Sequence, residues 1–325
     1  MSLGGRAGGS GSPMARFLLK HLLFLCLTLA AVSLIVFLMT ELTPGDVARK
    51  MLGAYATQEQ VDHLTREMRL DRPVLVRYLD YIGHLLSGDL GYSTRFKVPV
   101  ADIIFERLAN TALLAALSFL VIVPLSMLLG IAAGMREASK LDRAVLLFST
   151  ITASIPEFAM GVFLASLFVV GLGWLPGTAP LIGQERWSLA SQLILPVSTI
   201  VLFDIGYVVA MIRASMVEVM EQPYIRTAVL KGMPFRQVVL GHALRNAMIN
   251  PVTVILLQIN YLVTGVVVVE TVFAYPGFGR MMLEAALYKD IALIEVGALV
   301  AVFVAVLTQI LGDLGYRLLD PRLRS

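Results

Sequence analysis

Two acidic residues lie deep inside long apolar runs, and they are the first candidates for chemistry. Asp204 lies within the apolar run 193–212, and Glu157 follows Pro156 inside the run 145–172. With a helical rise of about 1.5 Å per residue, Asp204 falls about 16 Å from the outer end of its run, and Glu157 falls at a similar distance from the inner end of its run, so both lie near the midplane. Because an ionised carboxylate facing lipid is costly, each acid must face a cavity, a partner or another protein group. They can line a pathway that attracts cationic groups, or they can form structural hydrogen bonds or share a proton.

Three more candidate residues lie in the apolar run 249–273. Gln258 and Asn260 can hydrogen-bond between helices or line a pathway. Glu270 lies about 31 Å along this run, at its outer boundary, and a turn at 276–279 follows it. Two roles fit Glu270 equally well: shaping an outer gate together with that turn, or capping local structure.

Sequence patterns of nucleotide hydrolysis and of hydrolase chemistry are absent. The phosphate-binding pattern G-x-x-x-x-G-K-[ST] does not occur, and Lys231-Gly232 has its two residues in the opposite order. The chain has one cysteine, Cys26, and four scattered histidines, so we expect no metal site and no Cys–His pair. We therefore expect a chain that is not an enzyme and binds no cofactor.

Composition excludes a soluble protein with a polar surface. Only 15% of the residues are charged, against about 25% in an average soluble domain, and 58% are hydrophobic. Helices of about 20 apolar residues span a bilayer. Six such runs predict an all-α, polytopic membrane protein with six transmembrane helices, at about 17–39, 111–133, 145–172, 193–212, 249–273 and 291–311. The first run can alternatively be a signal peptide, although its uncharged stretch is longer than usual for one.

Basic residues predict the orientation. With the N-terminus inside, fourteen Lys and Arg residues lie in the inner segments, and three lie in the two short outer loops. Excess positive charge marks the cytoplasmic side, so both termini are predicted to be cytoplasmic. Residues 1–15 read as a disordered or tag-like tail, and residues 16–325 as one transmembrane domain.

The outer segment 40–109 is predicted to form a helical cap. Residues 57–69 form a polar helix, in which Thr57 and Gln60 can make a capping box. Residues 74–86 form an amphipathic helix. The cap can shield the outer mouth of a pathway or dock an external partner.

The inner segment 213–248 is too polar to span the membrane and too long for a simple connector. A helix should follow Pro223 and end near Leu230, where Gly232 can adopt a left-handed conformation. A second helix should begin at Pro234 and continue to about Ala247. The apolar residues of this pair exceed what a solvated loop requires: Tyr224, Ala228, Phe235, Val238 and Val239. The pair can insert into a groove of a cytoplasmic partner, or it can lie back on the chain's own inner face.

The inner helical pair distinguishes between two possible energy sources of a transporter, a partner ATPase and an ion gradient. A partner ATPase would need such a projection, whereas a gradient-driven secondary transporter using Asp204 and Glu157 has no evident use for it. A secondary transporter would also show inverted repeats, and no convincing repeat occurs. An ion channel would need a filter segment, which we do not find.

A family resemblance begins in the inner segment. It rests there on Tyr224-Ile225-Arg226-Thr227-Ala228, Lys231-Gly232 and His242-Ala243-Leu244-Arg245-Asn246-Ala247. The pattern resembles the EAA loop of ABC-importer permeases, specifically the B-type subunit of the dipeptide/oligopeptide (peptide/nickel/opine) family. Arg226 and Thr227 replace the glutamate and alanine of the EAA consensus. Further matches follow in order along residues 16–323: Pro44-Gly45-Asp46, Leu70-Asp71-Arg72-Pro73, Gly88-Asp89-Leu90-Gly91, Ser154-Ile155-Pro156-Glu157-Phe158, Val269-Glu270-Thr271-Val272-Phe273, Pro276-Gly277-Phe278-Gly279-Arg280 and Asp320-Pro321-Arg322.

The resemblance implies a type I ABC-importer permease fold in the cytoplasmic (inner) membrane of a bacterium. It implies a second, homologous but different permease, two cytoplasmic ABC ATPases that hold ATP and Mg, an extracytoplasmic solute-binding protein, and no nucleic acid. The segment 214–247 would then hold the coupling helices, with contacts to the ATPase from Tyr224, Arg226, Thr227, Ala228, Lys231, Gly232, Phe235 and Arg236. The solute stays open, because dipeptides, oligopeptides, glutathione, nickel chelates, glycosides and opines all use this family.

Overall fold

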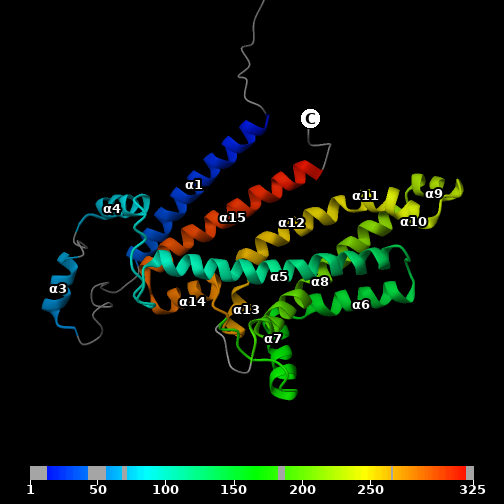
Figure 1. The fold of residues 1–325 in the computed structure, drawn as a ribbon. Helices are drawn as coiled ribbons and strands as arrows, with labels where there is room; N and C mark the ends of the chain where they lie inside the picture. Colours follow the sequence, from blue (N-terminus) through cyan, green and yellow to red (C-terminus); the bar gives the residue numbers. More distant parts are fainter. Residues whose placement is uncertain (1–12, 43–55, 68–71, 182–186, 265, 320–325) are drawn as a thin grey trace, which may run out of the picture. The chain divides into compact units, whose positions relative to one another are not determined.

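The chain folds almost entirely as α-helices (Figure 1). The computed structural model describes residues 13–42, 56–67, 72–181, 187–264 and 266–319. Within these residues there is no β-strand, only one isolated bridge between Tyr92 and Pro99. The predicted all-α class is confirmed, whereas the matching segments 44–46 and 320–322 lie outside the described residues.

Four described helices are long and apolar enough to cross a membrane. They lie within α1 (Pro13–Leu42), α5 (Val100–Gly134), α8 (Leu189–Met220) and α15 (Ile291–Leu319). The helix predicted for the run 249–273 is divided into α12 (Ile249–Thr264) and α13 (Val267–Val272), with residue 265 outside the described part. The number of six spans therefore remains a prediction.

A fifth candidate span is broken in the middle. α6 (Lys140–Ser154) and the following helical segment, α7 (Glu157–Ala165) with the π-helix η1 (Ser166–Gly171), meet at an angle of 99°. The cause is Pro156, which disfavours a helical conformation in the residue before it. Ile155 is accordingly extended, with φ −92° and ψ 122°. The predicted interruption at 156–157 is confirmed.

The chain divides into two compact units, which are described separately. The first contains residues 1–100 and 290–306, with α1, α3 (Gln58–Glu67), α4 (Val74–Leu86) and the beginning of α15. The predicted capping box of α3 is present, because the Thr57 N–H donates to Gln60 Oε1 at 2.9 Å and the Gln60 N–H donates to Thr57 Oγ1 at 3.4 Å. The predicted helix 74–86 corresponds to α4.

Asp290 organises the polar part of the first unit. Its fully buried carboxylate accepts hydrogen bonds from Ser93 Oγ at 2.5 Å and from the Arg95 N–H at 3.0 Å. The other carboxylate oxygen accepts from the Leu293 N–H at 3.3 Å, in the first turn of α15. The side chain thus caps a helix and fixes a turn that precedes α5.

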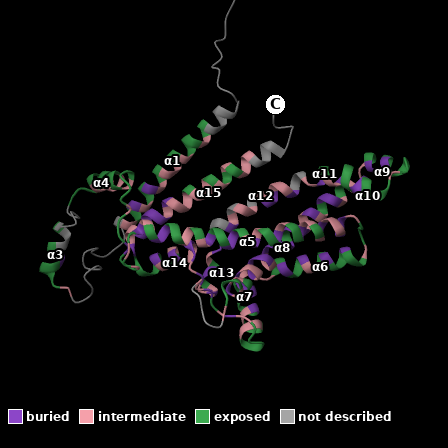
Figure 2. Ribbon diagram, viewed as in Figure 1, coloured by how far each residue is buried: buried purple, intermediate pink, exposed green. Residues whose placement is uncertain are grey.

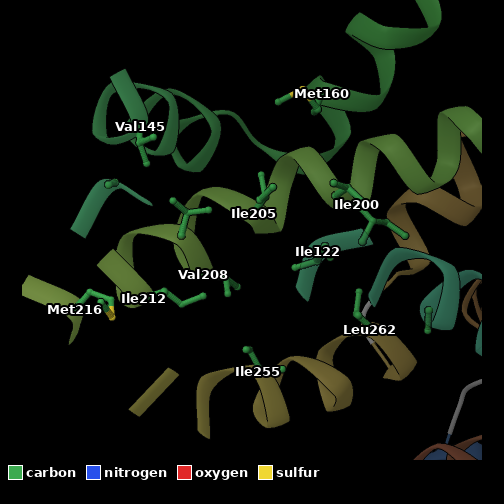
Figure 3. Close-up of a cluster of buried hydrophobic side chains, with 14 of the residues drawn as sticks. Ile122, Val145, Met160, Ile200, Ile205, Val208, Ile212, Met216, Ile255 and Leu262 are labelled. Carbon is green, nitrogen blue, oxygen red and sulfur yellow. The ribbon is translucent and has the colours of Figure 1, made fainter. Parts of the chain in front are cut away.

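α8 forms the centre of the second unit, which contains residues 101–289 and 307–325. In Figure 3, Ile205 and Val208 of α8 lie between Val145 of α6 and Ile255 of α12. α6 approaches the backbone of α8 closely at Gly206, because a Cβ atom there would lie 2.7 Å from the Ser149 carbonyl oxygen. Figure 2 accordingly shows extensive burial along α8.

An ion pair joins one end of α8 to the start of α6. Asp142 is buried and accepts from Nε and Nη2 of Arg213, each at 2.8 Å. Oδ2 of Asp142 also accepts from the Ala138 N–H at 2.9 Å. The bidentate geometry fixes the turn between α5 and α6 against α8.

Many large apolar residues are exposed. Figure 2 shows exposed residues along the long helices. Leu19 is 68% exposed, Leu120 is 70% exposed and Phe163 is 62% exposed. Large exposed apolar side chains in such numbers mark contact with a membrane or a partner protein.

Candidate functional site

The predicted helical pair of the inner segment is present. α9 (Pro223–Leu230) is followed by Gly232 at φ +77°, and α10 (Phe235–Val238) begins after Pro234. A Cβ atom on Gly232 would meet no atom within 4 Å, so the backbone conformation, rather than space, favours glycine there. The predicted left-handed position is confirmed.

The second inner helix contains a π-helical segment. η2 (Val239–Ala243) follows α10, and α11 (Leu244–Ala247) follows η2. Nδ2 of Asn246 donates to the Tyr224 hydroxyl at 3.1 Å, which connects α11 to α9. The two inner helices therefore form one hydrogen-bonded unit around Gly232.

Exposure divides the predicted coupling residues into two sets. Seven are exposed, namely Tyr224, Arg226, Thr227, Lys231, Gly232, Phe235 and Arg236. Ala228, at 8% exposed, is buried against the chain's own core, as are Val238 and Val239. Packing on the chain's own core thus accounts for the buried apolar residues of the pair. It does not account for three exposed apolar residues, Tyr224, Phe235 and the 79% exposed Leu230, which we call the apolar tip.

The two deep acids are neighbours in the structure. Glu157 is the first residue of α7, and Asp204, 5% exposed, faces it from α8 closely enough for an electrostatic interaction. Helix α12 contributes Tyr261 beside Glu157 and Gln258 beside Asp204. Oε1 of Glu157 and Oδ2 of Asp204 are buried and have no hydrogen-bond partner among the described residues.

The cluster contains three of the predicted pathway residues and one that was missed. Tyr261 was not predicted, although it lies three positions after Gln258 and therefore on the same face of a helix. The side chain of Asn260 lies outside the described residues. Two neighbouring carboxylates in a medium of low dielectric constant favour sharing one proton or accepting a cation, so both predicted roles remain open.

Glu270 lies in a different polar cluster, in α13 at the end of the fifth predicted span. The fully buried carboxylate accepts from Thr111 Oγ1 at 2.5 Å and from the Arg280 N–H at 2.8 Å. The second bond caps α14 (Phe278–Tyr288), which agrees with the predicted capping role. A role as an outer gate remains a prediction. Thr111 was missed, since nothing in the local sequence connects it to Glu270.

Tyr275 completes the Glu270 cluster. Burial, with the nearby Glu270 carboxylate, raises the pKa of the Tyr275 hydroxyl, which therefore stays protonated. This hydroxyl donates to the Asn110 carbonyl oxygen at 2.6 Å, while Nδ2 of Asn110 donates to the Pro276 carbonyl oxygen at 2.9 Å. The reciprocal bonds fix the turn 274–279 against the beginning of α5.

Family models match nearly the whole chain. The model described as binding-protein-dependent transport system inner membrane component matches residues 126–325. A model for the N-terminal part of such membrane components matches residues 14–115.

Individual relatives match along their full length. A protein of Brucella abortus (strain 2308), named as a peptide transport system permease, is 36% identical over 313 residues, which cover 96% of this chain and 99% of the relative. The glutathione transport system permease protein of Salmonella typhimurium is 35% identical over 311 residues, covering 96% and 99%.

A solved structure has a similar fold. The crystal structure of an amino acid ABC transporter with histidines matches with a TM-score of 0.52 and 14% identity, covering 67% of this chain and 94% of that chain. At this identity the likeness concerns the fold alone.

These findings agree with the apolar helices and place the chain in the inner membrane as a multi-pass protein. The gradient-driven alternative has no support among the relatives. The chain therefore belongs to the family of binding-protein-dependent transport system inner membrane components, as a permease subunit of an ABC importer.

Proposed function

We propose that this chain forms half of the translocation pathway of an ATP-driven importer for peptides or peptide-like solutes. The names of the Brucella and Salmonella relatives support this solute class. The second half of the pathway is a homologous but different permease, and an extracytoplasmic solute-binding protein delivers the solute. Six spans with both termini in the cytoplasm complete the proposed topology.

Energy comes from two cytoplasmic ABC ATPases, which hold ATP and Mg and receive the helices of 214–247. The observation that carries this assignment is the apolar tip of the inner pair, with Tyr224 43% exposed and Phe235 52% exposed. An exposed apolar helix pair in the cytoplasm needs a groove of another protein. Gly232 lies between the two helices and sets the angle at which they enter that groove.

Copurification with nucleotide-dependent uptake tests this function. The tagged chain is coexpressed with its co-encoded permease, ATPase and solute-binding subunits, purified in detergent and reconstituted into proteoliposomes. The ATPase should copurify. Uptake of a labelled dipeptide should require ATP on the side of the vesicle membrane that carries the ATPase. A matched chain with Tyr224→Ala and Phe235→Ala should reach the membrane but lose the ATPase.

Two results would contradict the proposal. One is uptake that continues without ATP and stops with an ionophore, as in a gradient-driven carrier. The other is a double variant that retains the ATPase and full uptake, which would remove the inner pair from coupling.

A further inference from the structure

A cavity of about 250 Å³ lies within the first unit, whereas the Glu157–Asp204 cluster belongs to the second. It lies between α4, the turn at 87–91 and the first turns of α15. Its main lining residues are Tyr81, His84, Leu85, Asp89, Glu295 and Val296. None of the functions above uses this cavity.

The deep wall of the cavity is polar and buried. Glu295 is only 8% exposed, and its Oε1 accepts from Thr40 Oγ1 at 2.7 Å. The Tyr81 hydroxyl is also buried, lies close to Glu295 and has no hydrogen-bond partner among the described residues. Stacking of the Tyr81 ring on Phe37, with centroids 5.8 Å apart, holds the hydroxyl in place. Burial, with the nearby Glu295 carboxylate, raises the pKa of this hydroxyl, which stays protonated and does not compete with Glu295 for a cation.

The mouth of the cavity is acidic, and its side walls are apolar. His84 and Asp89 are exposed, and Nδ1 of His84 lies 3.3 Å from Oδ2 of Asp89. Leu85, Leu90 and Val296 provide the apolar walls. The described lining residues include two carboxylates, of which Asp89 lies beside His84, and no Lys or Arg, so the buried Glu295 carboxylate makes the cavity favour a cation over an anion.

We propose that this cavity binds a primary ammonium group on a short aliphatic body, such as the free amino terminus of an arriving solute. The ammonium N–H groups donate to the Glu295 carboxylate, and the aliphatic part contacts Leu85 and Val296. That the cavity binds the solute rests on the proposed function and on the proposed orientation of the chain, in which this cavity lies on the outer side of the membrane. It narrows the solute class to molecules with a free amino group.

Amine-dependent thermal stabilisation tests the site without nucleotide or transport. The purified complex, in nanodiscs of phosphatidylcholine and phosphatidylglycerol at neutral pH, is titrated with n-butylamine or with n-butanol of nearly the same shape. Butylamine should raise the melting temperature of this subunit saturably, and butanol should not. Glu295→Gln removes one charge-assisted hydrogen bond and should therefore raise the half-saturating butylamine concentration about tenfold.

Matched variants separate binding from folding. Glu295→Gln keeps an acceptor for the Thr40 hydroxyl and should weaken butylamine binding. Ala292→Leu, which fills the cavity, should abolish it. Asp80→Asn is the control, because Asp80 lies on the same helix but pairs with Arg72 at 3.3 Å outside the cavity.

Equal stabilisation by butylamine and butanol, or unchanged butylamine binding in Glu295→Gln and Ala292→Leu, would overturn the site. Phosphatidylethanolamine carries the same ammonium group, so the titration is repeated in nanodiscs that contain it. If butylamine still raises the melting temperature in these nanodiscs, the natural ligand is a soluble amine. If the increase disappears, the lipid headgroup occupies the cavity and the assignment to a solute is rejected. Butylamine binding without ATP-driven uptake would reject the proposed function but not the site.

Discussion

The carboxylate of Glu270 occupies the space that a side chain on Gly277 would need. A Cβ atom on Gly277 would overlap Oε1 and Cδ of Glu270 and would lie 2.5 Å from Oε2. The turn can therefore close around the carboxylate only with glycine at this position, and the Arg280 N–H then reaches Glu270. The buried acid and the turn form one structural unit at the end of the fifth predicted span.

Gly277→Ala should destabilise this unit. The methyl group must displace the buried carboxylate from its hydrogen bonds, which costs about 1–3 kcal/mol in free energy of unfolding. Thermal unfolding of the purified subunit measures this cost. Gly83→Ala is the control, because a Cβ atom there meets nothing within 4 Å and alanine favours a helix. Equal melting temperatures of the Gly277→Ala variant and the unchanged protein would contradict the close contact.

Gly232→Val should uncouple transport from ATP hydrolysis. Valine at φ +77° costs about 1–2 kcal/mol or more, so the turn between α9 and α10 should change its geometry. The permease should still reach the membrane, whereas solute-stimulated ATPase activity of the reconstituted complex should fall. Gly241→Val serves as the control, since Gly241 lies in the same segment with open space and no positive φ. Normal stimulation in Gly232→Val would reject the coupling role of this turn.

Cysteine labelling should establish the orientation. In a Cys26→Ala background, a cysteine at the exposed Asp80 position should react with an impermeant maleimide in intact spheroplasts, because α4 belongs to the predicted outer cap. A cysteine at the exposed Arg236 position should react only after permeabilisation. The opposite pattern would invert the topology derived from the basic residues.

Asp204→Asn should leave the subunit stable. The asparagine keeps the shape and the neighbour Gln258, and it removes one of two adjacent acids. Asp204→Leu should instead cost about 1–3 kcal/mol, because polar neighbours lose a partner in a buried site. Melting temperatures of both variants measure the difference.

Uptake by Asp204→Asn separates the two roles of the acid pair. Because Asp204 is only 5% exposed, we expect uptake of cationic and neutral peptides to change by the same factor. A selective loss of cationic peptides would instead place Asp204 on the pathway.

Arg213→Ala should be far more destabilising than Arg72→Ala. The first variant leaves Asp142, whose side chain is 2% exposed, without its bidentate cation, at a cost of about 3–5 kcal/mol. Arg72 pairs with Asp80 on the surface at 3.3 Å, with side chains 40% and 49% exposed, and such pairs contribute less than about 1 kcal/mol. Similar unfolding free energies for both variants would contradict the structural role of the Asp142–Arg213 pair.

Features that depend on neighbouring residues were predictable from the sequence. The Thr57–Gln60 capping box, the break at Pro156 and the left-handed Gly232 are all present where local patterns predicted them. Capping, proline geometry and positive φ act within a few residues of the chain, so their signals survive without tertiary contacts. The apolar runs likewise identified the helices, because a bilayer requires long apolar segments.

Contacts between distant segments were decided only by the tertiary structure. The sequence by itself determined that Glu157, Asp204 and Glu270 lie in apolar surroundings and need partners. Packing of α7 and α12 on α8 brought Glu157, Asp204 and Tyr261 together, while Thr111, 159 residues away, became the partner of Glu270. Polar side chains can satisfy a buried acid from any helix, and the choice among helices depends on how their surfaces fit, which no local pattern encodes.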